Sequence, residues 1–125
     1  VVSVVSGKRV IAIEDSIVRG TTCRNRVKSL KDAGAEKVML CVSCPPIISP
    51  CYYGIDFPSK QELIASTKNV EQIKEFLGLD GLCYLSVNGM LDAMPLPGEY
   101  FCTACFTGQY PVNPDFNFNK YQFEE

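Results

Sequence analysis

The stretch that decides the fold is VIAIEDSIVRGTT, residues 10–22. Its first four residues are apolar and lead directly into two carboxylates, Glu14 and Asp15, after which comes a short loop. This pattern is typical of a buried strand that ends in a loop, with a helix beginning near Thr21. The first turn of a helix presents unpaired backbone N–H groups and a partial positive charge. We therefore predict that this loop binds an anion such as a phosphate group.

The residue types within the loop support a phosphate site. Gly20 lacks a Cβ and lets the backbone approach a ligand closely, and Ser16, Thr21 and Thr22 supply hydroxyl groups. The loop matches neither the G-x-G-x-x-G pattern nor the G-x-x-x-x-G-K-[ST] pattern, so it is not a nucleotide motif of either kind. The two carboxylates would repel phosphate but suit a vicinal diol or a Mg²⁺ ion. Together these features suggest a ribose 5-phosphate with a metal ion nearby.

The following segments alternate between strand and helix. Apolar runs predict buried strands over 9–13 and 37–44, and a third strand over 81–87. The segment between the first two strands reads as a helix that begins at Thr21 and ends at Gly34. Further helices are predicted over 60–66, 70–77 and 88–94, the first two opened by the capping boxes Ser59/Glu62 and Asn69/Gln72. The predicted fold class is α/β with a parallel sheet flanked by helices.

Length and charge limit the possible functions. The chain has 125 residues, enough for one domain with a modest core. Its net charge of −2 gives no general attraction to nucleic acids or anionic membranes. No apolar run approaches the roughly 18 residues of a membrane helix. The sequence opens without Met or a secretory signal, so we expect an excerpt of a longer protein from a reducing compartment, the cytoplasm.

The nine residues from Glu14 to Thr22 resemble the phosphoribosyl pyrophosphate motif of the type I phosphoribosyltransferases. Three later stretches, SCPPIISPCYYGIDFPSKQELIA, YLSVNGML and CTACFTGQYP, resemble the carboxyl-terminal part of the glutamine phosphoribosylpyrophosphate amidotransferases. The resemblance covers nearly all of residues 3–112. It implies that residues 1–94 are the carboxyl-terminal portion of a phosphoribosyltransferase domain and that residues 95–125 are an irregular, cysteine-containing tail.

The resemblance implies an enzyme that makes 5-phosphoribosylamine from phosphoribosyl pyrophosphate and glutamine-derived ammonia, the first committed step of purine synthesis. Glu14 and Asp15 would then contact the ribose hydroxyls and a substrate-bound Mg²⁺ ion. The chain has no His, and no residue in it is assigned as catalytic. A glutaminase domain of the same full-length chain and a homo-oligomer are implied partners, without nucleic acid or membrane. The residues implied to wrap the 5-phosphate are Ser16, Ile17, Val18, Arg19, Gly20, Thr21 and Thr22.

The seven cysteines cannot all pair with one another, because their number is odd. The resemblance to the iron–sulfur class implies that Cys51, Cys102 and Cys105 ligate a 4Fe–4S cluster, with a fourth ligand upstream of residue 1. By itself, the C-x-x-C of the last two would fit zinc or a redox pair equally well. Because the loop around Cys51 and the tail lack periodicity of their own, we expect the cluster to hold them in place. Packing is the predicted role of Cys23, Cys41 and Cys83, while that of Cys44 is open.

Two other classes of function fit the same residues. A phosphoribosyltransferase-like module can sense phosphoribosyl pyrophosphate through the same loop without catalysing a reaction. The cysteines would also suit a structural module that a metal stabilises. The combination of the cysteine trio with YLSVNGML favours the amidotransferase over the sensor.

Overall fold

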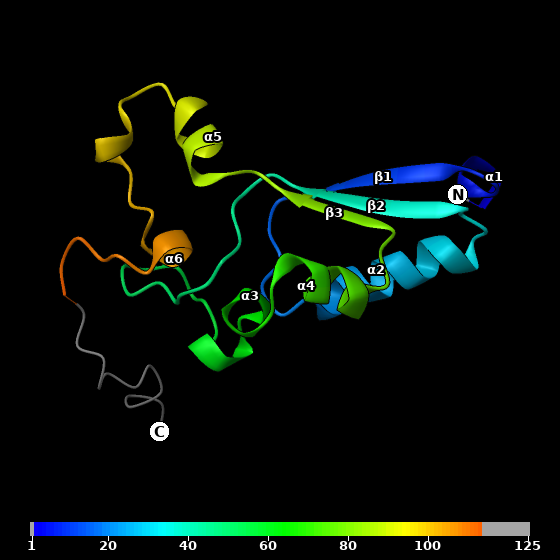
Figure 1. Ribbon diagram of the computed structural model, residues 1–125, viewed down its shortest axis with the longest axis horizontal. Coiled ribbons are helices and arrows are strands. Elements are labelled where there is room, and N and C mark those ends of the chain that lie inside the picture. Colours follow the sequence, from blue (N-terminus) through cyan, green and yellow to red (C-terminus); the bar gives the residue numbers. More distant parts are fainter. Residues whose placement is uncertain (1, 114–125) are drawn as a thin grey trace.

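The computed structural model describes residues 2–113 as a three-stranded parallel sheet with helices on one side and an irregular lobe beyond one end (Figure 1). The strands are β1 (Arg9–Glu14), β2 (Lys37–Val42) and β3 (Gly81–Tyr84). The helical segments, of which η1 and η2 are 3₁₀ turns, are α1 (Val2–Val5), α2 (Thr21–Asp32), η1 (Lys60–Glu62), α3 (Ile64–Thr67), α4 (Val70–Leu77), α5 (Val87–Asp92), η2 (Gly98–Tyr100) and α6 (Ala104–Thr107). None of the helices in the described part of the chain has the length and apolar character of a membrane span.

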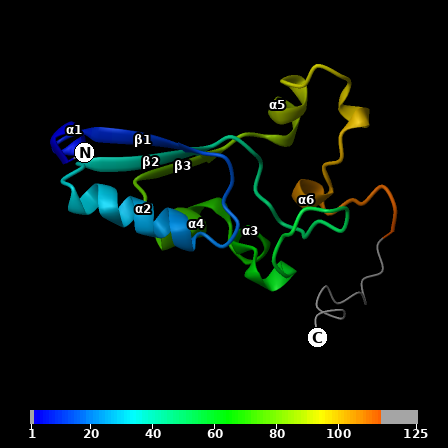
Figure 2. The same cartoon turned by 180° about the vertical axis from the view of Figure 1, so that it is seen from behind.

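The strands lie in the order β1-β2-β3, and both pairs are parallel, which confirms the predicted fold class. The register places Ile13 opposite Cys41, and Cys41 opposite Cys83. The carboxyl ends of the strands therefore meet at one edge, where open α/β sheets bind their ligands. The lobe that carries α5 and α6 lies beyond this edge (Figures 1 and 2).

Helices α2 and α4 pack side by side against one face of the sheet (Figure 1). Alternate residues of β2 point to this face and are almost fully buried, as the strand period of two requires. The helices contribute apolar side chains at helical spacing to the same cluster. The buried cluster comprises Ile17, Cys23, Val27, Val38, Leu40, Val42, Ile64, Ile73, Leu77 and Leu79.

The prediction of a buried strand over 9–13 is wrong in one respect. Ile11 is 59% exposed and Ile13 is 69% exposed. The reason is that β1 is an edge strand of the described sheet and that helices cover only the opposite face. A continuous apolar run indicates a strand but cannot say which of its faces another segment covers.

The predicted start and end of α4 are confirmed, because capping interactions within the segment define them. Asn69 and Gln72 cap α4 reciprocally, and Gly78 ends this helix in the left-handed conformation at φ 71°. The predicted helix over 60–66 is divided into η1 and α3, because the fully buried Leu63 adopts an extended conformation between them. The third strand stops at Tyr84, since the Ser86 hydroxyl accepts a hydrogen bond from Gly89 N–H and begins α5.

The described part of the tail contains short helical segments between irregular stretches. From Pro95 to Asn113 it contains η2 and α6, and it ends α6 at Gly108 with φ 74°. Residues 114–125 of the predicted tail lie outside the described residues.

Candidate functional site

The loop between β1 and α2 surrounds a hollow of about 260 Å³ at the carboxyl edge of the sheet. Eight of the nine predicted site residues line this hollow, and Asp15 lies next to it as an exposed side chain. Cys23 lines it as well, although sequence reasoning gave this residue a packing role only. The lining residues are Glu14, Ser16, Ile17, Val18, Arg19, Gly20, Thr21, Thr22 and Cys23.

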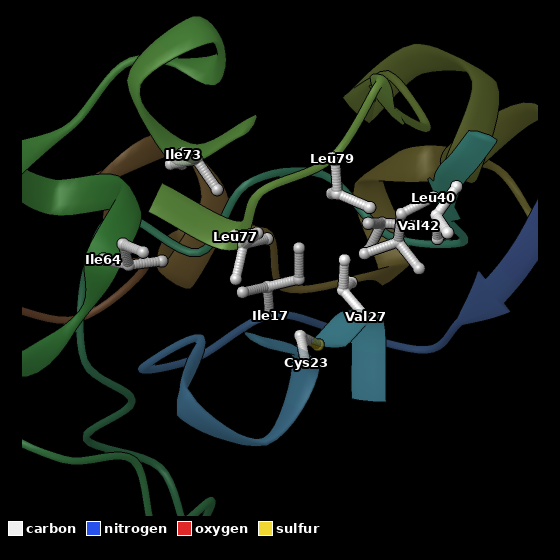
Figure 3. Packing of buried hydrophobic residues seen from close by; sticks show 10 residues of the cluster. Ile17, Cys23, Val27, Leu40, Val42, Ile64, Ile73, Leu77 and Leu79 are labelled. Carbon is white, nitrogen blue, oxygen red and sulfur yellow. The ribbon is translucent and has the colours of Figure 1, made fainter. Parts of the chain in front are cut away.

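The loop is anchored in the core by an apolar side chain. Ile17 is only 2% exposed and belongs to the main buried cluster. Figure 3 shows this side chain reaching toward Leu77 of α4, with Cys23 and Val27 of α2 beside it. Burial of an isoleucine side chain stabilises a fold by about 1.5–3 kcal/mol, so the loop has a fixed point at its centre.

Gly20 packs against the same helices. Its φ is 80°, and it is the residue that immediately precedes the first turn of α2. A Cβ at this position would lie 3.1 Å from Cδ1 of Ile64 and 3.3 Å from atoms of both Phe76 and Leu77. The missing Cβ therefore makes room for the core. Gly20 also lines the hollow, and close approach of a ligand to its backbone stays a prediction.

Two polar contacts join the loop to the segment around η1 and α3. The carbonyl oxygen of Val18 accepts a hydrogen bond of 2.9 Å from Ile64 N–H. The Arg19 guanidinium donates from Nε and Nη2 to Oε1 of Glu62, at 3.0 and 2.7 Å. The predicted phosphate residue Arg19 is thus paired with a carboxylate on a neighbouring segment.

The two adjacent carboxylates have different surroundings. Glu14, whose side chain is 19% exposed, accepts two hydrogen bonds of 2.7 and 2.6 Å from Nη1 of Arg26. The pairing raises the pKa of Arg26. Asp15 is exposed and accepts a hydrogen bond of 2.7 Å from Ser16 N–H. Arg26 therefore neutralises one charge of the pair, and Asp15 is the carboxylate open to solvent.

Sequence reasoning missed Arg26. The signal was available in part, since a cation on the second turn of the following helix can reach back to the end of the preceding strand. The charge pattern of α2, however, contains several basic residues, and only the three-dimensional packing selects the one that meets Glu14.

The first turn of α2 is open for a ligand. Gly20 offers no side chain to cap the helix, and no side-chain cap is formed at this end. Thr21 and Thr22 are exposed and add hydroxyl groups beside the backbone N–H groups. The arrangement of unpaired donors at a positive helix end can accept an anion of the size of a phosphate group.

Three groups at or near the site are kept protonated by burial. Burial raises the pKa of Tyr84 to about 12, and its hydroxyl has no hydrogen-bond partner among the described residues. Burial and then the charge of Asp15 raise the pKa of Cys44 to about 11. Burial also raises the pKa of Cys23, with Glu14 adding to the effect. These groups are neutral at physiological pH, so they add no charge close to the site.

The three cysteines of the predicted cluster lie in one neighbourhood. Burial raises the pKa of Cys105, and the nearby Cys51 and Cys102 thiols raise it further. Within residues 2–113, no group of three or more His, Cys, Asp or Glu side chains is positioned to hold a metal ion. Ligation by all three thiols would therefore require them to move closer together.

Hydrogen bonds and an aromatic contact connect the loop around Cys51 to the tail. The carbonyl oxygen of Cys105 accepts hydrogen bonds of 2.9 and 3.1 Å from the N–H groups of Ile48 and Ser49. The Tyr110 hydroxyl donates to the carbonyl oxygen of Pro50 at 2.7 Å, and its ring packs edge-on against Tyr52 at 5.2 Å between centroids. Direct protein contacts thus join the loop to the tail.

Comparison with known proteins gives close sequence relatives. The chain is 46% identical over 120 residues to a protein of Methanothermobacter thermautotrophicus named amidophosphoribosyltransferase, covering 96% of this chain and 25% of that protein. It is 51% identical over 109 residues to a Synechococcus elongatus protein of the same name, covering 87% of this chain and 22% of that one. No model of a protein family matches the chain.

Solved structures show the same relationship in three dimensions. The glutamine phosphoribosylpyrophosphate amidotransferase of B. subtilis, solved in complex with ADP and GMP, has a TM-score of 0.82 and 48% identity. The alignment covers 90% of this chain and 26% of that one. The chain is homologous to part of the amidophosphoribosyltransferases.

This homology confirms the resemblance that the loop and the three later motifs indicated. The chain spans about a quarter of the length of the amidophosphoribosyltransferases that it matches. A second solved structure, described as the allosteric regulatory enzyme of purine biosynthesis, has a TM-score of 0.82, and the alignment covers 25% of its chain. The chain therefore corresponds to one part of those longer proteins.

The packing of Gly20 leads to a prediction about stability. Gly20→Ala should lower the free energy of unfolding by about 1–2 kcal/mol for the left-handed backbone and by about 1–3 kcal/mol more for crowding in the core. Gly78→Ala is the matched control, because Gly78 has φ 71° but no atom within 4 Å of a Cβ. Urea unfolding of both variants measures the difference. Equal losses would contradict the packing role assigned to Gly20.

The link between Glu62 and the loop leads to a prediction about pH. Hydrogen bonds from Ser59 and Arg19 lower the pKa of Glu62 from its ordinary value of 4.5. The Glu62 carboxylate therefore stabilises the fold at pH values above its ordinary pKa of 4.5. This stabilisation is lost as the pH falls through the lowered pKa of Glu62 in the folded state. Glu62→Gln should reduce the melting temperature at neutral pH, and the deficit relative to wild type should shrink below about pH 4.

Thermal unfolding between neutral pH and about pH 3 tests this dependence. Arg19→Gln removes one cause of the lowered pKa of Glu62 and leaves the Ser59 hydrogen bonds. Its loss in melting temperature should therefore be smaller than that of Glu62→Gln and should shrink over the same pH range. A deficit for Glu62→Gln that does not change with pH would show that the carboxylate is not stabilised in the folded state.

Proposed function

We propose that this chain forms the phosphoribosyl-binding part of an enzyme that replaces the pyrophosphate of phosphoribosyl pyrophosphate with ammonia. The product would be 5-phosphoribosylamine, and the reaction would serve purine synthesis. The observation that carries the proposal is the hollow at the carboxyl edge of the sheet, lined by eight residues of the phosphoribosyl pyrophosphate motif. The homology to amidophosphoribosyltransferases supports it.

The loop would bind the 5-phosphate through donors that the fold leaves unpaired. Thr21, Thr22 and Cys23, which begin α2, line the hollow, so their backbone N–H groups and the two threonine hydroxyls are the proposed donors. Ile17 and Gly20 hold the loop against the helices, so the donors are in place before the ligand arrives. Donors that need no rearrangement lose less conformational entropy on binding, which is the advantage of a preorganised site.

The acidic pair would bind the ribose hydroxyls. Asp15 suits this role because it is exposed at the edge of the hollow and can accept hydrogen bonds from two adjacent hydroxyl groups. An exposed carboxylate is also a suitable donor for Mg²⁺, which when bound would neutralise the leaving pyrophosphate. Glu14 is less available, because Arg26 occupies both of its oxygens. We therefore assign the larger share of hydroxyl binding to Asp15.

The remaining parts of the enzyme are proposed to lie in the rest of a longer chain. Ammonia would come from a glutaminase domain, which would carry the nucleophile for that half-reaction. A homo-oligomer and a reducing compartment complete the proposal. Seven free thiols suit such a compartment, either the cytoplasm or a plastid, since one relative at 46% identity is a protein of Vigna aconitifolia named chloroplastic.

We also propose that Cys51, Cys102 and Cys105 contribute three ligands to a 4Fe–4S cluster, the fourth coming from outside this chain. The donor set fits in its chemistry, because such clusters are held by thiolates. The proximity of the three thiols supports the assignment, since Cys51 and Cys102 both act on the pKa of Cys105. The role would be structural, joining the loop to the tail where hydrogen bonds already connect them.

The role of Asp15 can be tested in the intact protein. Asp15→Asn preserves the shape of the side chain but removes its charge, so kcat/KM for ammonia-dependent transfer should fall at least about tenfold, the equivalent of about 1.4 kcal/mol. Asp32→Asn, at the other end of α2, is the matched control and should leave the rate unchanged. Pyrophosphate release measures both.

Two results would count against this assignment. Wild-type rates in Asp15→Asn would remove both the hydroxyl-binding and the metal-binding roles. Binding of phosphoribosyl pyrophosphate by the intact wild-type protein without any transfer would favour a sensing module.

The cluster can be tested by iron analysis of intact protein purified without oxygen. We expect about four iron atoms per chain and a brown protein in the wild type. Serine substitution of Cys51, Cys102 or Cys105 should each abolish or reduce the iron content and change the visible spectrum. Cys41→Ser is the control and should retain the iron of the wild type. Full iron content in any two of the three variants would show that other thiols are the ligands, and stoichiometric zinc in the wild type would make the site a zinc site.

A further inference from the structure

Two cysteines outside the proposed cluster lie next to each other on the sheet. Cys41 in β2 and Cys83 in β3 are direct register partners, so their side chains project from the same face. Their sulfur atoms are 3.0 Å apart, in a thiol–thiol hydrogen bond that Cys83 donates. Sequence reasoning assigned both residues to packing because they lie on predicted strands, and 41 intervening residues separate them.

The surroundings of the pair differ from those of a packed core. Helices α2 and α4 cover the opposite face of the sheet, whereas the face that carries the pair is open in the described part of the chain (Figures 1 and 2). Cys83 is exposed and Cys41 is partly exposed. Ile13, the register partner of Cys41 on the other side, is also exposed. Both thiols are therefore accessible to small molecules in the described part of the chain.

The backbone geometry allows a covalent bond between them. Neighbouring strands lie about 4.8 Å apart, and disulfides join Cα atoms that are about 4.4–6.8 Å apart. Direct register partners meet this requirement without a shift of either strand. The thiols already point toward each other, so bond formation requires only a small approach of the two sulfur atoms.

We propose that Cys41 and Cys83 are a dithiol modification site that a small-molecule disulfide, such as oxidised glutathione, converts into a cross-strand disulfide. In the first step one cysteine thiolate attacks the reagent, forms a mixed disulfide and releases one thiol. In the second step the other cysteine thiolate attacks the protein sulfur of the mixed disulfide and releases the second thiol. The two cysteines lose two electrons and two protons, and the reagent gains both.

The pair does not have the properties of a rapid peroxide sensor. The hydrogen bond to Cys41 raises the pKa of Cys83, which keeps this thiol protonated at neutral pH. Thiolates are the attacking species in exchange, so the reaction should be slow and should depend on the redox balance of the small-molecule pool. The bond would fix β3 to β2 one residue before Tyr84, at the edge of the sheet that also carries the substrate loop.

The test uses the intact protein without oxygen. The protein is incubated with excess oxidised glutathione, its remaining thiols are alkylated after denaturation, and it is digested without reductant. Mass spectrometry should find the peptide of Cys41 joined to the peptide of Cys83, and dithiothreitol should separate them. In Cys41→Ser and Cys83→Ser the joined peptides should be absent, and a glutathione adduct should accumulate on the remaining cysteine of the pair.

Cys44→Ser is the matched control, because Cys44 follows the same strand but its thiol donates to the carbonyl oxygen of Pro45. This variant should form the joined peptides at the rate of the wild type. Recovery of both Cys41 and Cys83 as alkylated thiols after incubation would overturn the proposal, as would a bond from either residue to a different cysteine. None of these outcomes depends on transferase activity. The disulfide proposal can therefore fail while the proposed transferase function holds, and the transferase function can fail while the disulfide forms.

Discussion

The burial of Ile17 beneath the first turn of α2 is the contact on which the candidate site depends. A loop of six residues between a strand and a helix has many conformations, and ordering its backbone costs about 1–2 kcal/mol per residue. Ile17 offsets part of this cost by joining the core, and Gly20 allows the loop to lie flat against Ile64, Phe76 and Leu77. The apolar side of the loop thus holds it in place, and the polar side remains for a ligand.

A second consequence concerns the charges at the strand end. Two adjacent carboxylates next to a phosphate site would disfavour the binding of an anion if both were uncompensated. Arg26 pairs with Glu14, while the partial charge at the start of α2 lies beside the loop. The electrostatic potential at the loop is therefore more favourable to phosphate than the adjacent carboxylates Glu14 and Asp15 alone suggest. The same pairing separates two chemically similar residues into a structural one, Glu14, and a solvent-facing one, Asp15.

The sequence predicted those parts of the fold that local patterns control. The parallel sheet followed from three apolar runs separated by helical segments, and the start of α4 followed from the capping box of Asn69 and Gln72. Sequence patterns did not predict the contacts between segments that are far apart in the chain. The interruption at Leu63 depends on a core position that this side chain fills, and the exposure of Ile11 depends on which face the helices cover.

The same limit applied at the site. The motif from Glu14 to Thr22 predicted which residues would come together, because motif residues adjacent in sequence remain adjacent in space. Arg26, the packing role of Gly20 and the pairing of Cys41 with Cys83 could not be predicted, since each requires the relative position of two elements. Local chemistry was therefore a better guide to the identity of the site than to the forces that shape it.

The contacts between the loop and the tail change the expected contribution of a cluster. Intramolecular hydrogen bonds contribute about 0.5–1.5 kcal/mol each, so the bonds to the carbonyl oxygens of Cys105 and Pro50, together with the Tyr52–Tyr110 contact, amount to a few kcal/mol at most. That is enough to bias the two segments toward each other but small against the cost of ordering them. A cluster would bind thiols that the fold has already brought into one neighbourhood, so less of its binding free energy would be lost in closing a long loop. In this arrangement protein contacts select the conformation, and metal–thiolate bonds would stabilise it.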